Sequence, residues 1–173
     1  MIDRSLLDAL AALTTGIYVL TVRDGDHRHG MSSSWATQVS GDPALLMAAV
    51  DRRAHTHDVL VRTGRFALNV VGRSGRQLED YFYSAASRRP DNLDTVVCDA
   101  SPQGLPYLRD ASVSLECRVV ARHPAGDHTL FVAEVTHAVT RTADRPLTSL
   151  DLDYVYVGEV IPRPGLSKPS RPS

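Results

Sequence analysis

The 173-residue sequence has little of several features that mark particular protein classes. Its two cysteines, Cys98 and Cys117, are too few for a disulfide framework and do not form a close metal-binding pair. No apolar run approaches the roughly 20 residues needed to cross a bilayer, and residues 1–4 do not begin a secretory signal. The net charge of −1 offers no attraction for a polyanion. We therefore expect a reduced, cytoplasmic protein that binds neither membrane nor nucleic acid.

The remaining composition suits one folded domain. Hydrophobic residues make up 43% of the chain, which is enough to bury a full core at this length. We expect a single domain over residues 1–161. Residues 162–173 are rich in Pro and Ser, and we expect them to form a flexible C-terminal tail.

Short β-rich segments outnumber helical ones and arrive in hairpins. Apolar patterning predicts strands at 17–22, 29–35, 44–50, 66–71, 113–119, 131–139 and 154–157, the last one closing the sheet. The same reasoning predicts helices at 3–13, 55–63 and 75–83, and a long surface excursion at 84–110. The sequence therefore predicts a mainly β fold with peripheral helices, an antiparallel barrel.

Hydroxyl side chains are concentrated between Gly30 and Ser40. Three consecutive serines, 32–34, follow Met31, and Thr37 comes shortly after. Hydroxyls both donate and accept hydrogen bonds, so this segment suits an uncharged site for a phosphate or a flavin. The alternative is a serine-rich strand end on a half-exposed sheet, with no ligand at all.

A second candidate site lies where the predicted helix at 55–63 begins. Helix N-termini present free amide groups and a partial positive charge that favour a phosphate. Thr56 lies in the first turn of this helix, and Arg53 lies just before it. His55 and His57 have no apparent third ligand in the sequence, so we expect no metal site.

A third candidate is His128, which follows the turn Gly126-Asp127 and begins a long predicted strand. This placement projects an imidazole into a cleft, although a surface histidine at a turn is the alternative. No Gly-x-Gly-x-x-Gly motif follows a strand, so the sequence gives no support for a Rossmann dinucleotide site.

In order and spacing, these segments resemble the short-chain flavin reductases, the reductase components of two-component flavin-dependent monooxygenases. The resemblance runs from about Leu13 to about Val139 and rests on the segments 13–21, 30–43, 64–71, 77–82 and 126–128. It implies an FMN-binding split β-barrel of antiparallel Greek-key type. It also implies a flavin groove at a homodimer interface.

The resemblance also implies roles for individual residues. His128 would be the catalytic residue and would face the nicotinamide. Residues of four segments would bind the flavin, namely Met31, Ser32, Ser33, Ser34, Ser40, Ala48, Ala49, Val50, Arg53, Thr56 and Phe82. Among them, the alanines and Val50 would line the isoalloxazine ring, and Thr56 would help to hold the phosphate.

The implied function is NAD(P)H-dependent reduction of FMN or FAD, which a transient partner oxygenase then uses. Hydride transfer between these cofactors needs alignment of two rings rather than a protein nucleophile. Two alternatives stay open. The chain would be a flavoprotein that holds FMN or FAD tightly for electron transfer or its own oxidation, or a non-catalytic ligand-binding split-barrel module. The sequence does not distinguish FMN from FAD, or NADH from NADPH.

Overall fold

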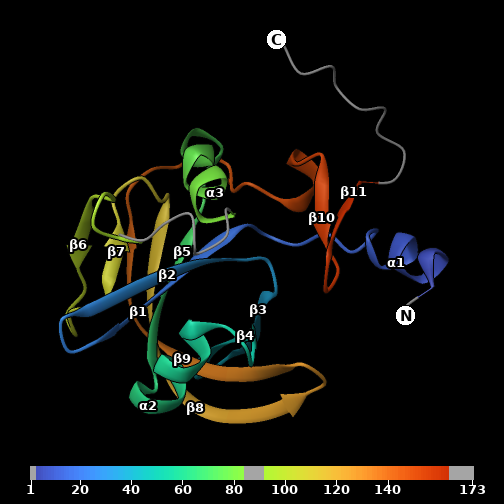
Figure 1. Ribbon diagram of the computed structural model, residues 1–173. Coiled ribbons are helices and arrows are strands. Elements are labelled where there is room, and N and C mark those ends of the chain that lie inside the picture. The colour runs from blue at the N-terminus through green and yellow to red at the C-terminus, as the bar shows by residue number, and fades with distance from the viewer. Residues whose placement is uncertain (1–2, 84–91, 164–173) are drawn as a thin grey trace.

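The computed structural model describes residues 3–83 and 92–163 (Figure 1). The helices are α1 (Arg4–Leu10), α2 (His55–Thr63) and α3 (Arg76–Tyr83), with 3-10 turns η1 (Arg73–Gly75) and η3 (Ser149–Asp151). The strands are β1 (Tyr18–Asp24), β2 (His27–Ser33), β3 (Ala36–Gly41), β4 (Ala44–Asp51), β5 (Arg65–Val70), β6 (Cys98–Ala100), β7 (Pro106–Leu108), β8 (Val113–Ala125), β9 (His128–Thr140), β10 (Tyr154–Tyr156) and β11 (Val160–Pro162).

Seven strands form one antiparallel sheet in the order β2-β1-β5-β8-β9-β4-β3. The two edge strands, β2 and β3, follow one another in the chain with only Ser34 and Trp35 between them. At this junction the Ala49 N–H donates a hydrogen bond to the Trp35 carbonyl, at 2.9 Å. The sheet is therefore a curved antiparallel structure with its edges brought together, and the mainly β prediction is confirmed.

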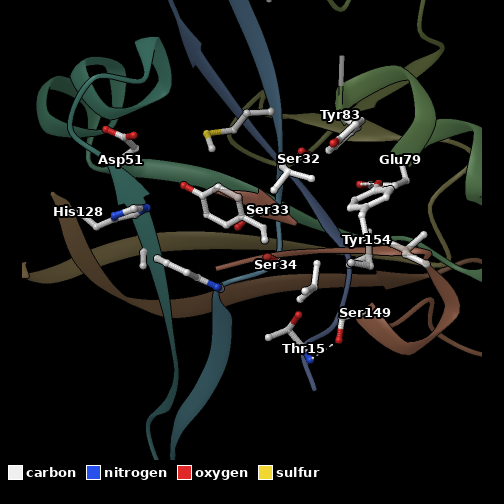
Figure 2. A pocket seen from close by; sticks show the side chains of 18 residues that line it. Thr15, Ser32, Ser33, Ser34, Asp51, Glu79, Tyr83, His128, Ser149 and Tyr154 are labelled. Carbon is white, nitrogen blue, oxygen red and sulfur yellow. Dashed lines mark hydrogen bonds between the residues drawn. The ribbon is translucent and has the colours of Figure 1, made fainter. Parts of the chain in front are cut away.

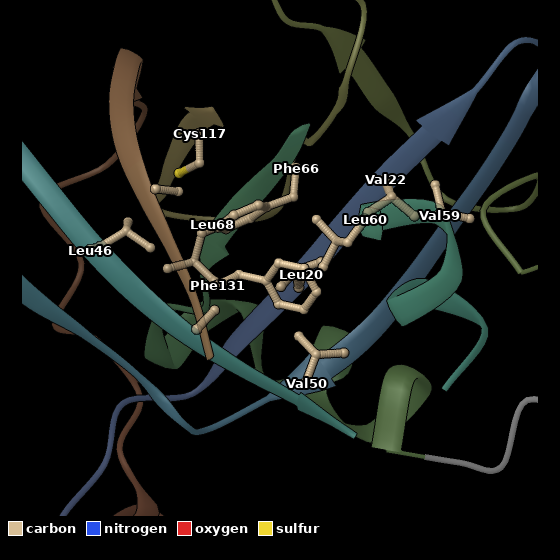
Figure 3. Packing of buried hydrophobic residues seen from close by; sticks show 12 residues of the cluster. Leu20, Val22, Leu46, Val50, Val59, Leu60, Phe66, Leu68, Cys117 and Phe131 are labelled. Atoms are coloured by element: carbon tan, nitrogen blue, oxygen red, sulfur yellow. The ribbon is translucent and has the colours of Figure 1, made fainter. Parts of the chain in front are cut away.

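The barrel interior is filled by apolar side chains from its strands and from α2 (Figure 3). Leu20, Phe66 and Phe131 are fully buried there, because alternate residues of a half-buried strand face the core. Val59 and Leu60 of α2 close the cluster. The helix ends at Gly64, whose φ of 64° lets its N–H bond to the Leu60 carbonyl.

A second apolar cluster lies outside the barrel, beneath α3. Leu78 and Phe82, one turn apart, pack with Val19 and Leu108 in this cluster. A Cβ at Gly30 would lie 2.8 Å from the Phe82 ring, so glycine at this position lets the helix approach β2. The cluster fixes α3 beside β2.

The C-terminal strands do not close the barrel, so that prediction for residues 154–157 is wrong. The three residues of β10 pair with β11 in a separate two-stranded sheet. This hairpin packs against α1 beside the barrel (Figure 1) through the side chains of Leu7, Ala11, Val155, Val157 and Ile161.

The predicted domain end at residue 161 falls inside β11, which ends at Pro162. Residues 164–173 of the predicted tail, and residues 84–91 of the predicted excursion, lie outside the described residues. The rest of the excursion contains the β6–β7 hairpin. None of the helices described is long and apolar enough to span a membrane.

Candidate functional site

A cavity of about 230 Å³ lies between the barrel and the C-terminal hairpin (Figure 2). We call its barrel side the inner wall, formed by Met31, Ser32, Ser33, Ser34, Trp35, Ala49, Asp51 and His128. We call the opposite side the outer wall, formed by Glu79, Tyr83, Leu152, Tyr154, Val155, Tyr156 and Val160. Thr15, Ile17 and Ser149 also line the cavity.

Three serines form the middle of the inner wall (Figure 2). Ser32 and Ser33 end β2, where they pair with Val19 and Tyr18 of β1, and Ser34 begins the connection to β3. Within the described residues, no hydrogen bond engages any of these three hydroxyls. Each hydroxyl is therefore available both to donate to a ligand and to accept from it.

His128 lies at one end of the cavity together with Asp51, its partner across the β4–β9 pair (Figure 2). Only 5% of His128 is exposed, so it is not a surface histidine. Its Nδ1 lies 2.6 Å from Oδ1 of Asp127, and this hydrogen bond lowers the pKa of the Asp127 carboxyl. The Trp35 ring lies 4.8 Å from the imidazole, centroid to centroid. These contacts fix the ring and leave Nε2 for a ligand.

Asp51 gives the same end of the cavity an acidic group. The Arg53 guanidinium binds its carboxylate, with Nη2 2.8 Å from Oδ2, and the Arg53 backbone N–H donates to Oδ1 at 2.8 Å. These hydrogen bonds from Arg53 lower the pKa of Asp51 to about 2. Asp51 is therefore ionised near neutral pH.

The other end of the cavity brings α3 against β10 (Figure 2). Tyr154 donates a hydrogen bond from its hydroxyl to Oε1 of Glu79, at 2.6 Å, and stacks on Tyr83 with ring centroids 4.5 Å apart. Burial raises the pKa of the Glu79 carboxyl. Burial also raises the pKa of Tyr154 well above its ordinary value, and the bond to Glu79 adds to this effect. The tyrosine is therefore the proton donor of this pair.

The structure brings together about half of the residues predicted from the sequence. The strands β2, β4 and β9, with the residue that follows β2, place six of them on the inner wall, namely Met31, Ser32, Ser33, Ser34, Ala49 and His128. These residues are far apart in the sequence, from Met31 to His128. They line one cavity because of the way their strands pair in the sheet.

The structure corrects the prediction that Ala48 and Val50 line the ring site. Both are fully buried and belong to the barrel core, so their side chains do not line the cavity. Successive side chains of a strand point to opposite faces, and only Ala49 of the three faces outward.

The other predicted residues lie outside this cavity. Ser40 is half-buried on β3, and Phe82 packs beneath α3. Arg53 is exposed and bound to Asp51. Thr56 is fully buried in the first turn of α2, and its Oγ1 has no hydrogen-bond partner among the described residues. No group of three or more His, Cys, Asp or Glu in the described part of the chain is arranged to hold a metal ion.

Sequence reasoning missed the outer wall and two inner-wall residues. Asp51 could have been found, because it lies two positions after Ala49 on the same strand face. Trp35 directly follows the serines. Glu79, Tyr83 and the β10 tyrosines gave no such signal, since their position depends on packing between distant segments.

Comparison with known proteins places these features in a family. The model of the flavin reductase like domain matches residues 10–158. An NADH-dependent flavin reductase of Rhodococcus sp is 35% identical over 133 residues, which cover 75% of this chain and 73% of the relative. The NADH-dependent flavin reductase StyB of Pseudomonas fluorescens is 33% identical over 155 residues, covering 89% and 88% of the two chains.

Solved structures agree with these relatives. The styrene monooxygenase flavin reductase of Pseudomonas putida S12 superimposes with a TM-score of 0.70 at 30% identity, covering 83% of this chain and 90% of that one. The flavin reductase PheA2 in its native state gives a TM-score of 0.75 at 27% identity, covering 97% of this chain and all of the other. The split-barrel fold expected from the sequence is confirmed. The chain belongs to the family of flavin reductase-like domains.

Proposed function

We propose that this chain reduces FMN or FAD with NADH and supplies the reduced flavin to a partner monooxygenase. One observation carries the proposal: serine hydroxyls, a small alanine and a buried histidine converge on one cavity from three strands of the barrel. The named relatives that are NADH-dependent flavin reductases support the same activity.

The cavity fits the ring of a flavin in its chemistry and its size. The three free serine hydroxyls suit the polar edge of a tricyclic ring, and Ala49 leaves room beside them. A volume of about 230 Å³ lies below the roughly 300–1,000 Å³ typical of pockets for whole drug-sized ligands. The cavity would therefore take a ring system, while the chain that carries the phosphate lies outside it.

The residues would divide the work of binding between the ring and the phosphate. Ser32 to Ser34 would donate hydrogen bonds to the ring edge and stabilise negative charge there. The α2 N-terminus is a candidate for the phosphate, because its N-cap residue, Ala54, makes no side-chain capping bond. Thr56 and Arg53 would join this contact only if Thr56 became accessible and Arg53 left Asp51.

His128 would position the hydride donor. Reduced nicotinamide and oxidised flavin supply hydride donor and acceptor between them, so the protein needs no strong base. Asp127 and Trp35 hold the imidazole, which would orient the carboxamide through Nε2. The imidazole ring of His128 and the outer wall would also exclude water from the contact between the nicotinamide and the flavin.

We also propose that NADH is preferred over NADPH. Names of relatives that specify NADH support this preference.

The proposal includes a homodimer and a transient partner oxygenase. Leu6 lies on α1 and Leu13 three residues after its end, and they are 52% and 64% exposed; exposed leucines within one short segment favour a covering partner. A second copy of the chain is the partner we expect. Light scattering of the purified protein would give twice the chain mass.

The purified protein tests the activity directly. We expect steady oxidation of NADH only when FMN or FAD is added, and a much lower kcat/KM for NADPH. Flavin that stays bound through gel filtration, with no turnover of added flavin, would instead indicate a flavoprotein with a tightly held cofactor. Absence of flavin binding would leave the ligand-binding module.

A further inference from the structure

The Glu79 end of the cavity contains buried polar atoms that the protein leaves without partners. Glu79 is only 4% exposed, and its Oε2 has no hydrogen-bond partner among the described residues. The same holds for Oγ1 of Thr15, which lines the same cavity. Of the four such side-chain atoms found in the described residues, these two belong to residues that line the same cavity. Buried polar groups are rarely left unpaired, so the pair points to a ligand.

The surroundings of Glu79 define its chemical character. Tyr154 donates to Oε1, and the backbone N–H of Thr15 donates to Oγ of Ser149, at 3.1 Å. Tyr83 stacks on Tyr154 and shields the pair. Burial raises the pKa of this carboxyl. In its protonated form the carboxyl offers an O–H donor beside a carbonyl acceptor.

A protonated carboxyl is complementary to a group in which an N–H lies next to a carbonyl oxygen. The carboxyl O–H donates to the ligand carbonyl, and the carboxyl oxygen accepts from the ligand N–H. Within the proposed function, two ligands present such an edge: the imide edge of the flavin ring and the carboxamide of the nicotinamide. The shape of the edge is the same in both.

We propose that Glu79, assisted by Thr15, binds an amide-type edge of the ring that enters the cavity. This inference rests on the proposed function and assigns a second recognition point to its site, at the end opposite His128 (Figure 2). His128 and Glu79 would then act at opposite ends of one cavity.

Binding measurements with modified ligands test the inference and identify the ring. The probes are FMN against 3-methyl-FMN, which lacks the imide N–H, and NAD⁺ against 3-acetylpyridine adenine dinucleotide, which lacks the carboxamide NH₂. We expect one modification to weaken binding to the wild type by about tenfold or more, the effect of losing a buried hydrogen bond. Weaker binding of 3-methyl-FMN than of FMN would assign the flavin imide as the edge that Glu79 binds. Weaker binding of the acetylpyridine analogue than of NAD⁺ would assign the nicotinamide carboxamide.

Variants of Glu79 complete the experiment. Glu79→Gln keeps a donor and an acceptor, so we expect it to bind each probe within about threefold of the wild type. Glu79→Leu removes both groups, and the sensitive probe and its modified form should then bind equally. Asp80→Leu, on the exposed face of the same helix, should keep the wild-type discrimination.

The outcomes separate this inference from the proposed function. If the wild type binds FMN and NAD⁺ but tolerates both modifications, the inference is overturned and the reductase proposal stands. If the wild type discriminates and Glu79→Leu discriminates equally, Glu79 is not the recognising group. If the wild type binds neither FMN nor NAD⁺, both proposals are wrong. Where Glu79→Leu does not fold, tolerance of both modifications by the wild type still overturns the inference.

Discussion

The two walls of the cavity are built in different ways. Strand pairing positions the inner wall, where Asp51 lies opposite His128 and Ala49 lies opposite Leu130. The outer wall combines residues of α3 with a hairpin of two three-residue strands, and this hairpin reaches its neighbours through side chains. Tyr154 binds Glu79, and the Tyr156 ring lies 5.1 Å from that of Trp35.

This difference indicates a division of roles. The inner wall shares its backbone hydrogen bonds with the sheet around the core, so it can move only when the barrel opens. Among the described residues, the hairpin of the outer wall shares no backbone pairing with the barrel sheet, and it is held by side-chain contacts, a small apolar cluster with α1 and the packing of Tyr154 beneath α3. Regions with few such contacts open at lower free energy than the core. We therefore expect the inner wall to determine what binds, and the outer wall to determine how long it stays.

The largest effect should come from the core face of the inner-wall strands. Phe131 lies on β9 and is fully buried in the barrel. Phe131→Ala should lower the free energy of unfolding by about 3–5 kcal/mol because it leaves a cavity. Urea denaturation measures this loss. Val120→Ala, at an exposed position of β8, should change it by less than about 0.5 kcal/mol.

The second-largest effect should come from His128, on the face of β9 that lines the cavity. His128→Ala should raise the KM for NADH about tenfold, because an oriented hydrogen bond is lost, and should leave the flavin Kd within about twofold. Steady-state kinetics and a flavin titration give the two values. His123→Ala, at an exposed position of β8, is the control. An unchanged KM, or an equal loss of flavin affinity, would reject the positioning role.

A smaller effect should follow from the outer wall. Tyr156→Ala removes the ring that contacts Trp35, an aromatic pair worth about 0.5–1.5 kcal/mol. We expect ligand dissociation to become roughly 3–10 times faster in stopped-flow measurements, with little change in unfolding free energy. Tyr156→Phe retains the ring and should behave as the wild type. A loss of stability comparable to that of Phe131→Ala would show that the two walls are one structural unit.

The smallest effect is a pH dependence at Glu79. Its pKa is raised above 4.5 in the folded protein by burial and Asp80, against the opposing influence of Tyr154 and Arg76. The folded state therefore favours the protonated form, and stability falls as the pH rises past 4.5 until it levels off above the folded pKa. Glu79→Gln should match the wild type near pH 4 and be more stable near pH 8. A stability difference that does not grow with pH contradicts the assignment.

The sequence predicted the inner wall better than the outer wall for a physical reason. Alternation of apolar residues and the turn at Gly126-Asp127 are local signals, and they located β4, β9 and His128. The same alternation separates Ala49 from its neighbours Ala48 and Val50, although the family resemblance grouped the three together. The partner of β10 is another three-residue strand, and so short a segment carries almost no pattern.

Glu79 shows most clearly what the sequence alone does not predict. In the sequence it lies beside Asp80 on an ordinary amphipathic helix, and both look like solvated acids. Its burial depends on β10, which lies about 75 residues further along the chain. Such a contact depends on how distant segments pack, which single-sequence patterns do not contain.

An FMN titration of Ala49→Leu tests the central claim, that the cavity at the serines binds the flavin ring, most directly. The longer side chain would fill the space beside Ser32 to Ser34, and we expect FMN affinity to fall by about 100-fold or more with unfolding free energy nearly unchanged. Ala48→Leu, one residue away and facing the core, should instead lose about 1–3 kcal/mol of stability. Wild-type FMN affinity in a folded Ala49→Leu protein would contradict the account.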